Sequence, residues 1–422
     1  MKKKLAIVGT GISGLGAAYF LSKEYDLTLF EKENYIGGHT NTIDVSENGK
    51  EIPIDTGFIV FNHVTYPNLL RLFNRLKVPT KKSDMSFSVQ HDPTKLEFCG
   101  SGLNGLFAQR KNFFNLRYLR MLLEINRFNE TAPHILDNPK YEDWDLGDYM
   151  KENGYGEDIL NYYLIPMSSA VWTTPPGLML SFPVQSLVRF FYNHGFLGLN
   201  SQHQWWTVDG GSREYVKRIT ENFSDRVRLN SSVKQVLREE DKVRIVLENG
   251  SSEIFDKVIL ATHGHTSAKL LGNPTSLEKE LLPLFAYQKN TATLHTDESD
   301  MPKKKLCWSS WNYKILKDEA GNQKPFTIYW MNRLQNVSKN KNYFVTINDP
   351  GRIKREHIIR EIEYEHPLFS VENAKAQKKF PALNEEGPIY YAGAYFRYGF
   401  HEDGFLSAVG VAESILKRDP WI

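Results

Sequence analysis

The sequence predicts an α/β protein built on a parallel sheet, and three observations support this prediction. Residues 5–8 form a short, wholly apolar run, which is typical of a buried parallel strand. Residues 9–14 follow with the pattern Gly-x-Gly-x-x-Gly, and a helical pattern begins at once. A second apolar strand at 27–30 ends at Glu31, 22 residues after the first glycine. Together these elements predict a strand–turn–helix–strand unit of the kind that binds a dinucleotide.

Each glycine of the pattern has its own physical role. Gly9 permits a tight turn, Gly11 lets the backbone approach a pyrophosphate, and Gly14 allows close packing of helix on strand. A helical pattern follows at 15–21, and the free N–H groups and the helix dipole at its N-terminal end favour bound phosphate.

The carboxylate of Glu31, with Lys32 beside it, is placed to bind a ribose. A Gly-Gly pair follows six residues after Glu31 and precedes His39. This arrangement resembles the extended signature of the two-dinucleotide-binding-domain flavoproteins, which implies FAD rather than NAD. Many members of that group carry Arg after the pair. Because His39 stands there instead, no fixed positive charge is expected at this position.

Segments far along the chain resemble the flavin amine oxidase and phytoene desaturase superfamily. These segments are 54–58, 208–219, 255–262, 389–393 and 404–412. The resemblance implies that 54–58 runs beside the flavin ring and that the helix at 404–412 points its N-terminus at the flavin, where its dipole would stabilise negative charge. Ala394 replaces the acid that members often carry after the strand at 389–393.

The expected cofactor is FAD. The residues expected to contact it are Gly9, Gly11, Ile12, Ser13, Gly14, Glu31, Lys32, Gly37, Gly38, His39, Thr40, Thr56, Gly57, Phe58, Val233, Thr262, Gly393, Gly404, Phe405 and Leu406.

These dispersed segments predict a discontinuous, Rossmann-like FAD-binding domain with an inserted α+β substrate domain. The FAD-binding domain is expected to comprise residues 1–80, 200–265 and 380–422. The substrate domain is expected to comprise 81–199 and 266–379.

Residues 100–105 also match Gly-x-Gly-x-x-Gly, but the preceding strand at 95–99 alternates polar and apolar residues. A buried parallel strand does not alternate in this way, so we interpret 100–105 as a turn. No second nucleotide site is therefore expected, and the substrate should reduce the flavin directly.

Composition limits the partners and the compartment. A formal net charge of +2 argues against nucleic acid as the main partner. The two cysteines, Cys99 and Cys307, are too few for a disulfide framework or a cysteine-rich metal site, so no metal is expected and a reducing cytoplasm is the default compartment. Lys2 to Lys4 mimic the start of a secretory signal, but the phosphate-binding loop explains the glycines that follow better.

Residues 110–128 have helical periodicity, with arginines on one face and large apolar residues on the other. Such a helix can lie on an anionic membrane surface. It can equally bury its apolar face in the core of the substrate domain. Both interpretations stay open, and the first would make the protein peripheral to the inner membrane face.

Several segments also resemble a narrower bacterial branch of predicted NAD/FAD-binding proteins, allied to lipid-modifying enzymes of the cyclopropane-fatty-acid-synthase type. They are 193–195, 204–212, 294–297 and 399–404. This resemblance implies a desaturase of methyl-branched acyl chains. The aromatic residues concentrated in 81–199 and 266–379 suit a long apolar tunnel.

The expected reaction is hydride transfer from a substrate C–H bond to the flavin, with loss of a proton. His401 and Glu402, just before the C-terminal helix, are the expected catalytic residues, and His194, His295 and Lys289 are further candidates. The substrate is a small molecule or a lipid. Two alternatives stay open: an amine oxidase that releases hydrogen peroxide, and a non-redox flavoprotein. The electron acceptor (oxygen, a quinone or a carrier) also stays open.

Overall fold

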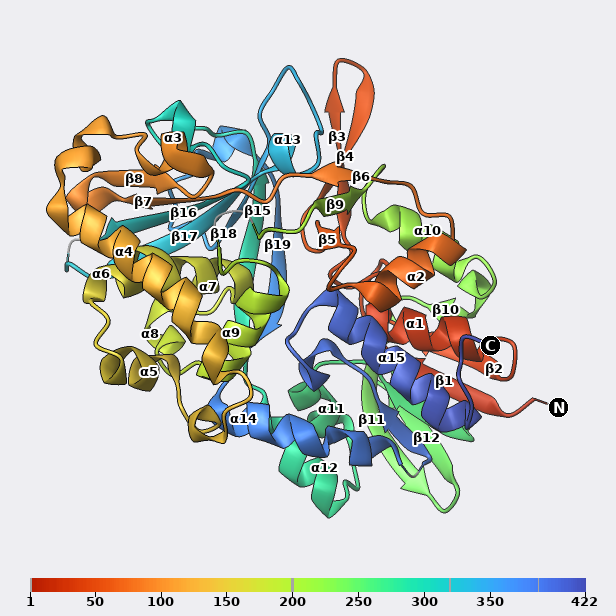
Figure 1. Cartoon of the computed structure of the whole chain (residues 1–422). Coiled ribbons are helices and arrows are strands. Elements are labelled where there is room, and N and C mark those ends of the chain that lie inside the picture. Colours follow the sequence, from red (N-terminus) through yellow and green to blue (C-terminus); the bar gives the residue numbers. More distant parts are fainter. Residues whose placement is uncertain (1, 199–200, 319, 386) are drawn as a thin grey trace.

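The computed structural model describes all residues except 1, 199–200, 319 and 386. The chain forms two lobes, the first built on a five-stranded sheet and the second on a seven-stranded sheet (Figure 1). Both termini lie at the outer side of the first lobe. The expected domain boundary at 199/200 lies outside the described residues.

The first lobe is built on a parallel sheet with the strand order β10-β2-β1-β14-β20. Its strands are β1 Lys4–Val8, β2 Asp26–Phe30, β10 Val227–Arg228, β14 Lys257–Leu260 and β20 Ile389–Tyr391. All four neighbouring pairs are parallel, and residues 5–7 are fully buried in the central strand β1. Burial on both faces explains why these strands are continuous apolar runs.

Helices cover one face of this sheet. They are α1 Ile12–Leu21, α2 Pro67–Arg75, α10 Arg213–Thr220 and α15 His401–Leu416. Helix α15 packs against α1 and α2, so the last helix of the chain lies beside the first. The antiparallel strands β11 Val233–Glu239, β12 Lys242–Leu247 and β13 Ser252–Phe255 contact the other side of the sheet, near β1 and β14.

Two helices that fall wholly or mostly in the expected substrate domain lie with the first lobe. They are α11 Gly264–Leu270 and α12 Ser276–Leu281. In α12, the carboxylate of Glu278 accepts hydrogen bonds from Arg238 of β11 and from the hydroxyl of Tyr391 in β20. Because these side chains bind α12 to two strands of the first lobe, the chain enters the second insertion after α12 rather than at residue 266.

The second lobe is built on a mixed sheet with the order β19-β15-β18-β17-β16-β7-β8. Its strands are β7 Phe87–His91, β8 Leu96–Cys99, β15 Tyr287–His295, β16 Trp311–Lys317, β17 Gln323–Trp330, β18 Phe344–Ile347 and β19 Ile358–Pro367. The two insertions share this one sheet, because β7 of the first pairs in parallel with β16 of the second.

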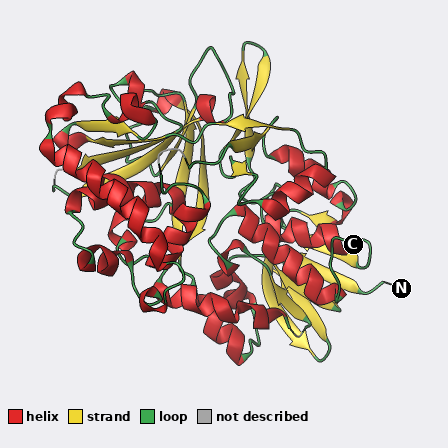
Figure 2. Cartoon of the chain, in the orientation of Figure 1, coloured by secondary structure: helices red, strands yellow, loops and turns green. Residues whose placement is uncertain are grey.

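Most helices of the second lobe lie on one side of this sheet (Figure 2). The helices after β8 are α3 Gly102–Leu106, α4 Leu116–Thr131, α5 Leu146–Glu152, α6 Glu157–Ile159, α7 Ile165–Trp172, α8 Pro176–Met179 and α9 Val184–Asn193. The later helices are α13 Met331–Leu334 and α14 Val371–Ala376. No helix among the residues that the structure describes is long and apolar enough to cross a membrane.

Short strands join the two lobes. β5 Phe61–Asn62 and β6 Thr80–Ser83 both pair with β9 Trp205–Val208. The segments by which the chain enters the first insertion (β6) and returns from it (β9) are therefore hydrogen-bonded to each other. A protruding hairpin consists of β3 Thr42–Glu47 and β4 Lys50–Asp55.

Two expectations about the first insertion can be compared with the structure. Residues 100–105 follow β8, which pairs antiparallel to β7 at a sheet edge. The expected turn covers only residues 100 and 101, because the short helix α3 begins at Gly102. The helix expected over 110–128 is instead divided. Residues 110–114 form a 3₁₀ turn, Asn115 is extended and caps the helix, and α4 begins at Leu116. The division leaves Phe114 outside the buried face.

Candidate active site

A cavity of about 510 Å³ lies at the carboxyl ends of the parallel strands and extends between the lobes. The ends of β1, β2, β14 and β20 all contribute to its wall, which is where parallel sheets bind ligands. The expected cofactor residues in the wall are Gly9, Gly11, Ile12, Ser13, Glu31, Lys32, Gly38, His39, Thr56, Gly57, Phe58, Val233, Thr262 and Gly393. Those outside the wall are Gly14, Gly37, Thr40, Gly404, Phe405 and Leu406.

The glycine loop has the geometry of a phosphate cradle. Gly9 has φ +99°, and a Cβ there would lie 2.7 Å from the carbonyl oxygen of Ala261. A Cβ on Gly14 would lie 2.0 Å from the carbonyl oxygen of Gly9, so this glycine sets the distance between turn and helix. At Gly11 a Cβ would meet nothing within 4 Å, which leaves the cavity side of the loop open.

The carboxylate of Glu31 is held at the end of β2. Oε2 accepts hydrogen bonds from the backbone N–H (2.9 Å) and hydroxyl (2.6 Å) of Thr10, and Oε1 accepts from the N–H of Glu33 (3.0 Å). Ser231 and Ser232 line the cavity beside it, next to the expected Val233. These serines were not among the expected cofactor residues, although their position directly before Val233 was a usable signal.

Gly37 to Thr40 run beside Thr56 to Phe58. A Cβ on Gly57 would lie 2.2 Å from the carbonyl oxygen of His39, and the N–H of Phe58 donates to that oxygen (2.8 Å). Gly57 is therefore required by close backbone approach.

A buried carboxylate outside the cavity wall ties these segments together. Asp55 accepts hydrogen bonds from the N–H (2.9 Å) and hydroxyl (2.7 Å) of Ser212, the hydroxyl of Thr42 (2.5 Å) and the amide of Gln335 (2.7 Å). Burial raises the pKa of Asp55, while these hydrogen bonds lower it. The sequence motifs at 54–58 and 208–212 are thus joined at one side chain.

Histidines from distant segments meet in the cavity wall. His39 stacks on Tyr364 with ring centroids 5.0 Å apart and lies 5.1 Å from His366. His263 Nδ1 lies 3.1 Å from a carboxylate oxygen of Glu365. Burial lowers the pKa of His263 to about 4 and that of His366 to about 3, so both rings are neutral at pH 7. Local sequence gave no signal for this cluster, because β19 brings Tyr364 to His366 there from the far end of the chain.

His401 and Glu402 are in the first turn of α15 rather than before it. His401 lines the cavity and stacks on Phe58 with ring centroids 3.8 Å apart, and its Nε2 lies 2.7 Å from the hydroxyl of Tyr215. Burial, with His39 nearby, lowers the pKa of His401 to about 3.

Glu402 lies outside the cavity wall. Its carboxylate accepts hydrogen bonds from the N–H (3.0 Å) and side-chain amide (2.7 Å) of Asn68 and from the N–H of Leu69 (2.9 Å). These contacts cap the N-terminus of α2, so its geometry is that of a structural residue.

The three further candidates also lie outside the wall. His194 is bonded to the carbonyl of Phe190 (2.8 Å), and His295 to the hydroxyl of Thr346 (2.7 Å). Lys289 is exposed.

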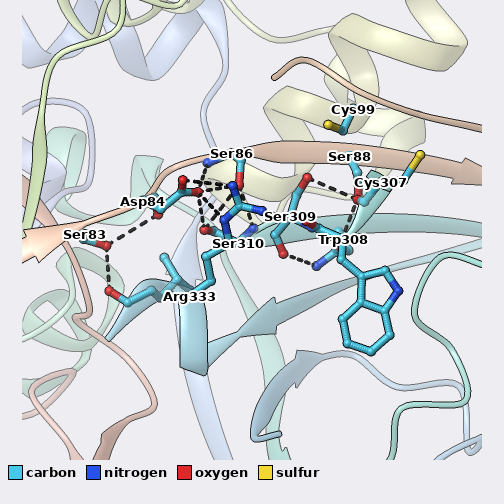
Figure 3. Close-up of polar contacts among 12 residues, drawn as sticks. Ser83, Asp84, Ser86, Ser88, Cys99, Cys307, Trp308, Ser309, Ser310 and Arg333 are labelled. Carbon is cyan, nitrogen blue, oxygen red and sulfur yellow. Dashed lines mark hydrogen bonds and ion pairs between the residues drawn. The ribbon is translucent and has the colours of Figure 1, made fainter. Parts of the chain in front are cut away.

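A polar network adjoins two residues of the cavity wall, Met85 and Trp311. Figure 3 draws this network, in which Asp84, Ser310 and Arg333 meet. The carboxylate of Asp84 accepts hydrogen bonds from the N–H of Ser86 (2.9 Å) and the hydroxyl of Ser310 (2.7 Å) and pairs with Arg333 (3.1 Å). Burial opposes ionisation of Asp84, yet these hydrogen bonds and Arg333 together lower its pKa. Because Met85 and Trp311 adjoin residues of this network, their backbones are held in place.

The residues present fit FAD. The open side of Gly11 suits the pyrophosphate, and the end of the cavity with Glu31 and Val233 suits the adenosine. At the other end, buried His39 Nε2 has no hydrogen-bond partner among the described residues and is free to meet the cofactor. No group of three or more metal-ligating side chains occurs in the described part of the chain. Fold and site together define a flavoprotein that binds FAD in a dinucleotide-binding domain.

Comparison with known proteins gives the family. A sequence model of the flavin containing amine oxidoreductases matches residues 12–337, which is more than half of the chain. The protein belongs to this family and is an FAD-dependent oxidoreductase. No curated protein sequence matches the chain closely enough to be counted as a relative.

Solved structures with the same fold include three enzymes of different specificity. A CLA-producing fatty acid isomerase from P. acnes has a TM-score of 0.67 at 14% identity, covering 98% of each chain. A putrescine oxidase bound to putrescine has 0.67 at 14% identity, covering 99% of this chain and 100% of its own. A cyclohexylamine oxidase from Brevibacterium oxydans IH-35A has 0.67 at 15% identity, with the same coverage. At these identities the similarity establishes the fold alone.

Proposed function

We propose that this flavoenzyme desaturates the acyl chain of a lipid. One observation carries the proposal, namely the apolar character of the cavity beyond the cofactor end. Its wall there includes the large side chains Met85, Val171, Trp172, Phe190, Phe196, Trp205, Trp311, Tyr329, Ile347 and Phe369. The only acids in the whole described wall are Glu31 and Glu365, and its only lysine or arginine is Lys32. A wall of this kind stabilises an aliphatic chain by desolvation.

Bound FAD would supply a two-electron acceptor for the substrate. The protein has to hold the acyl chain, exclude water and provide a site for the proton that leaves with the hydride. In this proposal His401 accepts the proton that leaves the substrate. Its ring is neutral at pH 7, and its Nε2 is already in contact with the hydroxyl of Tyr215, so Nδ1 is the atom that accepts the proton. Glu402 is not assigned a chemical step, because its carboxylate caps α2.

Oxidation of an amine is the second candidate. Its support is Glu365, a half-exposed carboxylate in the cavity wall that could receive an ammonium group. The similar putrescine and cyclohexylamine oxidases act on amines by their names. The similar fatty acid isomerase suggests a third outcome, in which an acyl chain is rearranged with no net oxidation.

The proposal extends to location. A membrane lipid as substrate fits a protein of the cytoplasm that contacts the inner membrane face through 110–128. The acceptor that reoxidises the flavin would be oxygen, a quinone or a carrier.

Anaerobic mixing of the holoprotein with candidate substrates tests the proposal. Phospholipids with methyl-branched acyl chains should bleach the flavin band near ~450 nm. Bleaching by putrescine or cyclohexylamine alone would favour amine oxidation instead. Acyl chains that change structure while the flavin ends oxidised would favour isomerisation. If no acyl chain bleaches the flavin or is altered, the lipid proposal fails.

A pair of variants separates the first two candidates. Glu365→Gln should weaken reduction by amines strongly and leave reduction by lipids within about twofold, because a neutral amide cannot pair with an ammonium group. Glu363→Gln on the same strand is the matched control.

A further inference from the structure

Six large apolar side chains are exposed together at the outer end of the second lobe. Leu103, Phe113, Phe114, Leu116, Leu123 and Leu306 are exposed by 74, 49, 89, 81, 71 and 56%. They make up six of the 14 exposed large hydrophobic side chains in the described part of the chain. Their elements contact one another. Helix α4 adjoins the 3₁₀ turn at 110–114, and α3 adjoins the turn at 305–307. The hydroxyl of Tyr118 in α4 donates a hydrogen bond to the carbonyl of Leu106 in α3 (2.7 Å). We call these six residues the α4 surface.

Helix α4 is apolar on two sides. Its inner side buries Tyr118, Met121 and Phe128 in the lobe. Its outer side carries Leu116 and Leu123 of the α4 surface, which fall on one helical face with Arg120. Core packing therefore accounts for the inner side only, and exposed aromatic and aliphatic groups on the outer side require another explanation.

Positive charge surrounds the α4 surface. Residues 110–128 hold five Lys or Arg and one Glu, a net charge of +4, against +2 for the whole chain. Lys303, Lys304 and Lys305 lie beside Leu306 and are exposed.

A small polar pocket of about 150 Å³ opens next to the α4 surface. Its wall includes Lys95, Lys111 and Arg117, with Gln109 and the asparagines 112 and 115 as neutral hydrogen-bonding groups. Arg117 pairs with Asp158 through two hydrogen bonds of 2.7 and 2.6 Å, which raise its pKa. Lys95 and Lys111 have no ion pair within 4.0 Å among the described residues. The pocket thus has two uncompensated positive charges.

We propose that the α4 surface docks on a bilayer containing anionic phospholipids and that the pocket of Lys95 and Lys111 binds a lipid phosphate. The side chains of Phe114 and Leu116 would enter the acyl boundary while the lysines meet the headgroup. Interleaved cations and large apolar groups are typical of membrane-surface helices, whereas lysine is depleted in the cores of protein–protein interfaces. The inference rests on the proposed function only in taking the membrane as the source of substrate.

Sedimentation of the holoprotein with vesicles tests this inference. The probes are phosphatidylcholine vesicles and vesicles with about one third phosphatidylglycerol, at fixed ionic strength. The native protein should bind the anionic vesicles far more tightly than the neutral ones. Lys95→Gln with Lys111→Gln should lower the partition coefficient about 25-fold, because each charge near the surface contributes roughly fivefold. Phe114→Ser with Leu116→Ser should lower it at least about tenfold.

The matched control is Ile254→Ser with Lys242→Gln, an exposed apolar residue and an exposed lysine on the β12–β13 hairpin of the first lobe. It should bind as the native protein does. FAD content and melting temperature report that each variant is folded.

The inference is overturned if the native protein binds neither vesicle, binds both equally, or is unaffected by both double substitutions. If vesicle binding falls in Phe114→Ser with Leu116→Ser but not in Lys95→Gln with Lys111→Gln, the proposed phosphate site is refuted. Displacement by millimolar inorganic phosphate at constant ionic strength would make the pocket a site for free phosphate. Vesicle binding without flavin reduction by lipids would refute only the proposed function, and reduction by detergent-dispersed lipid without vesicle binding would refute only this inference.

Discussion

The two ends of the cavity are built in different ways. At the Glu31 end, backbone and short side chains from consecutive residues make the site, as in the glycine loop and the contacts of Thr10 with Glu31. At the other end, the wall comes from strands β15 to β19 and from helices α7 and α9, and side chains make the surface. The first end requires one backbone conformation and so tolerates few sequences. The second requires only volume and polarity, so specificity can change there while the cofactor is kept.

The largest expected effect lies in the glycine loop. Gly14→Ala would place a Cβ 2.0 Å from a backbone oxygen, which can be relieved only by separating α1 from β1. The FAD content of the purified protein, measured by absorbance, should fall at least about tenfold. The control is Gly410→Ala in α15, where a Cβ meets nothing within 4 Å. That variant should keep its FAD and be stabilised by up to ~1 kcal/mol. A normal FAD content in Gly14→Ala would show that the glycine loop does not require one backbone conformation.

The next largest effect is expected at Asp55, whose carboxylate joins the motifs at 54–58 and 208–212. Asp55→Asn replaces one carboxylate oxygen, a hydrogen-bond acceptor, by an amide NH₂ group, which is a donor. Because Ser212 and Gln335 donate hydrogen bonds to this side chain, the free energy of unfolding should fall by about 3 kcal/mol. Urea denaturation of the holoprotein measures this change. Asp44→Asn removes an exposed pair with Arg213 and should cost less than about 1 kcal/mol. Equal losses in both variants would contradict the role given to Asp55.

Variants of two neighbouring residues in α15 should distinguish a catalytic role from a structural one. His401→Phe keeps the stack on Phe58 but loses the contact with Tyr215, and should slow flavin reduction by substrate at least about tenfold at normal FAD content. Glu402→Gln weakens the cap of α2 and should lower the free energy of unfolding by about 1–2 kcal/mol. Its rate per bound FAD should change less than about twofold. A rate loss in Glu402→Gln as large as in His401→Phe would return Glu402 to the catalytic residues.

The smallest effect is a pH dependence of stability from a buried histidine outside the cavity wall. Burial lowers the pKa of His194 to about 4, below the ordinary value of 6.5, so the unfolded chain binds more protons than the folded one between these values. The contribution to stability is complete above pH 6.5 and is lost as the pH falls toward 4, with a slope of at most about 1.4 kcal/mol per pH unit. His194→Gln should make this slope shallower in urea denaturation between pH 4 and 7, and exposed His134→Gln should not. An unchanged slope in His194→Gln would mean that this histidine is accessible to protons in the folded state.

The sequence by itself determined the dinucleotide end and its cofactor. The residues from Gly9 to Glu31 are local in the chain, and their spacing specifies a backbone geometry. The interruption of the chain by two insertions could also be predicted, because each remaining strand of the parallel sheet is an apolar run that must be buried.

Only the tertiary structure decided the rest of the site. His39, His263 and His366 lie more than 100 residues from one another in the sequence. They meet because strand β19 brings His366 to the other two histidines. The break at Asn115, which exposes Phe114, and the capping role of Glu402 depend on partners that are distant in sequence. Side-chain clusters of this kind arise from packing between elements, whereas periodicity and motif spacing describe one element at a time. For that reason the dinucleotide-binding end could be derived from the sequence, while the fold decided which residues make up the α4 surface and the apolar wall.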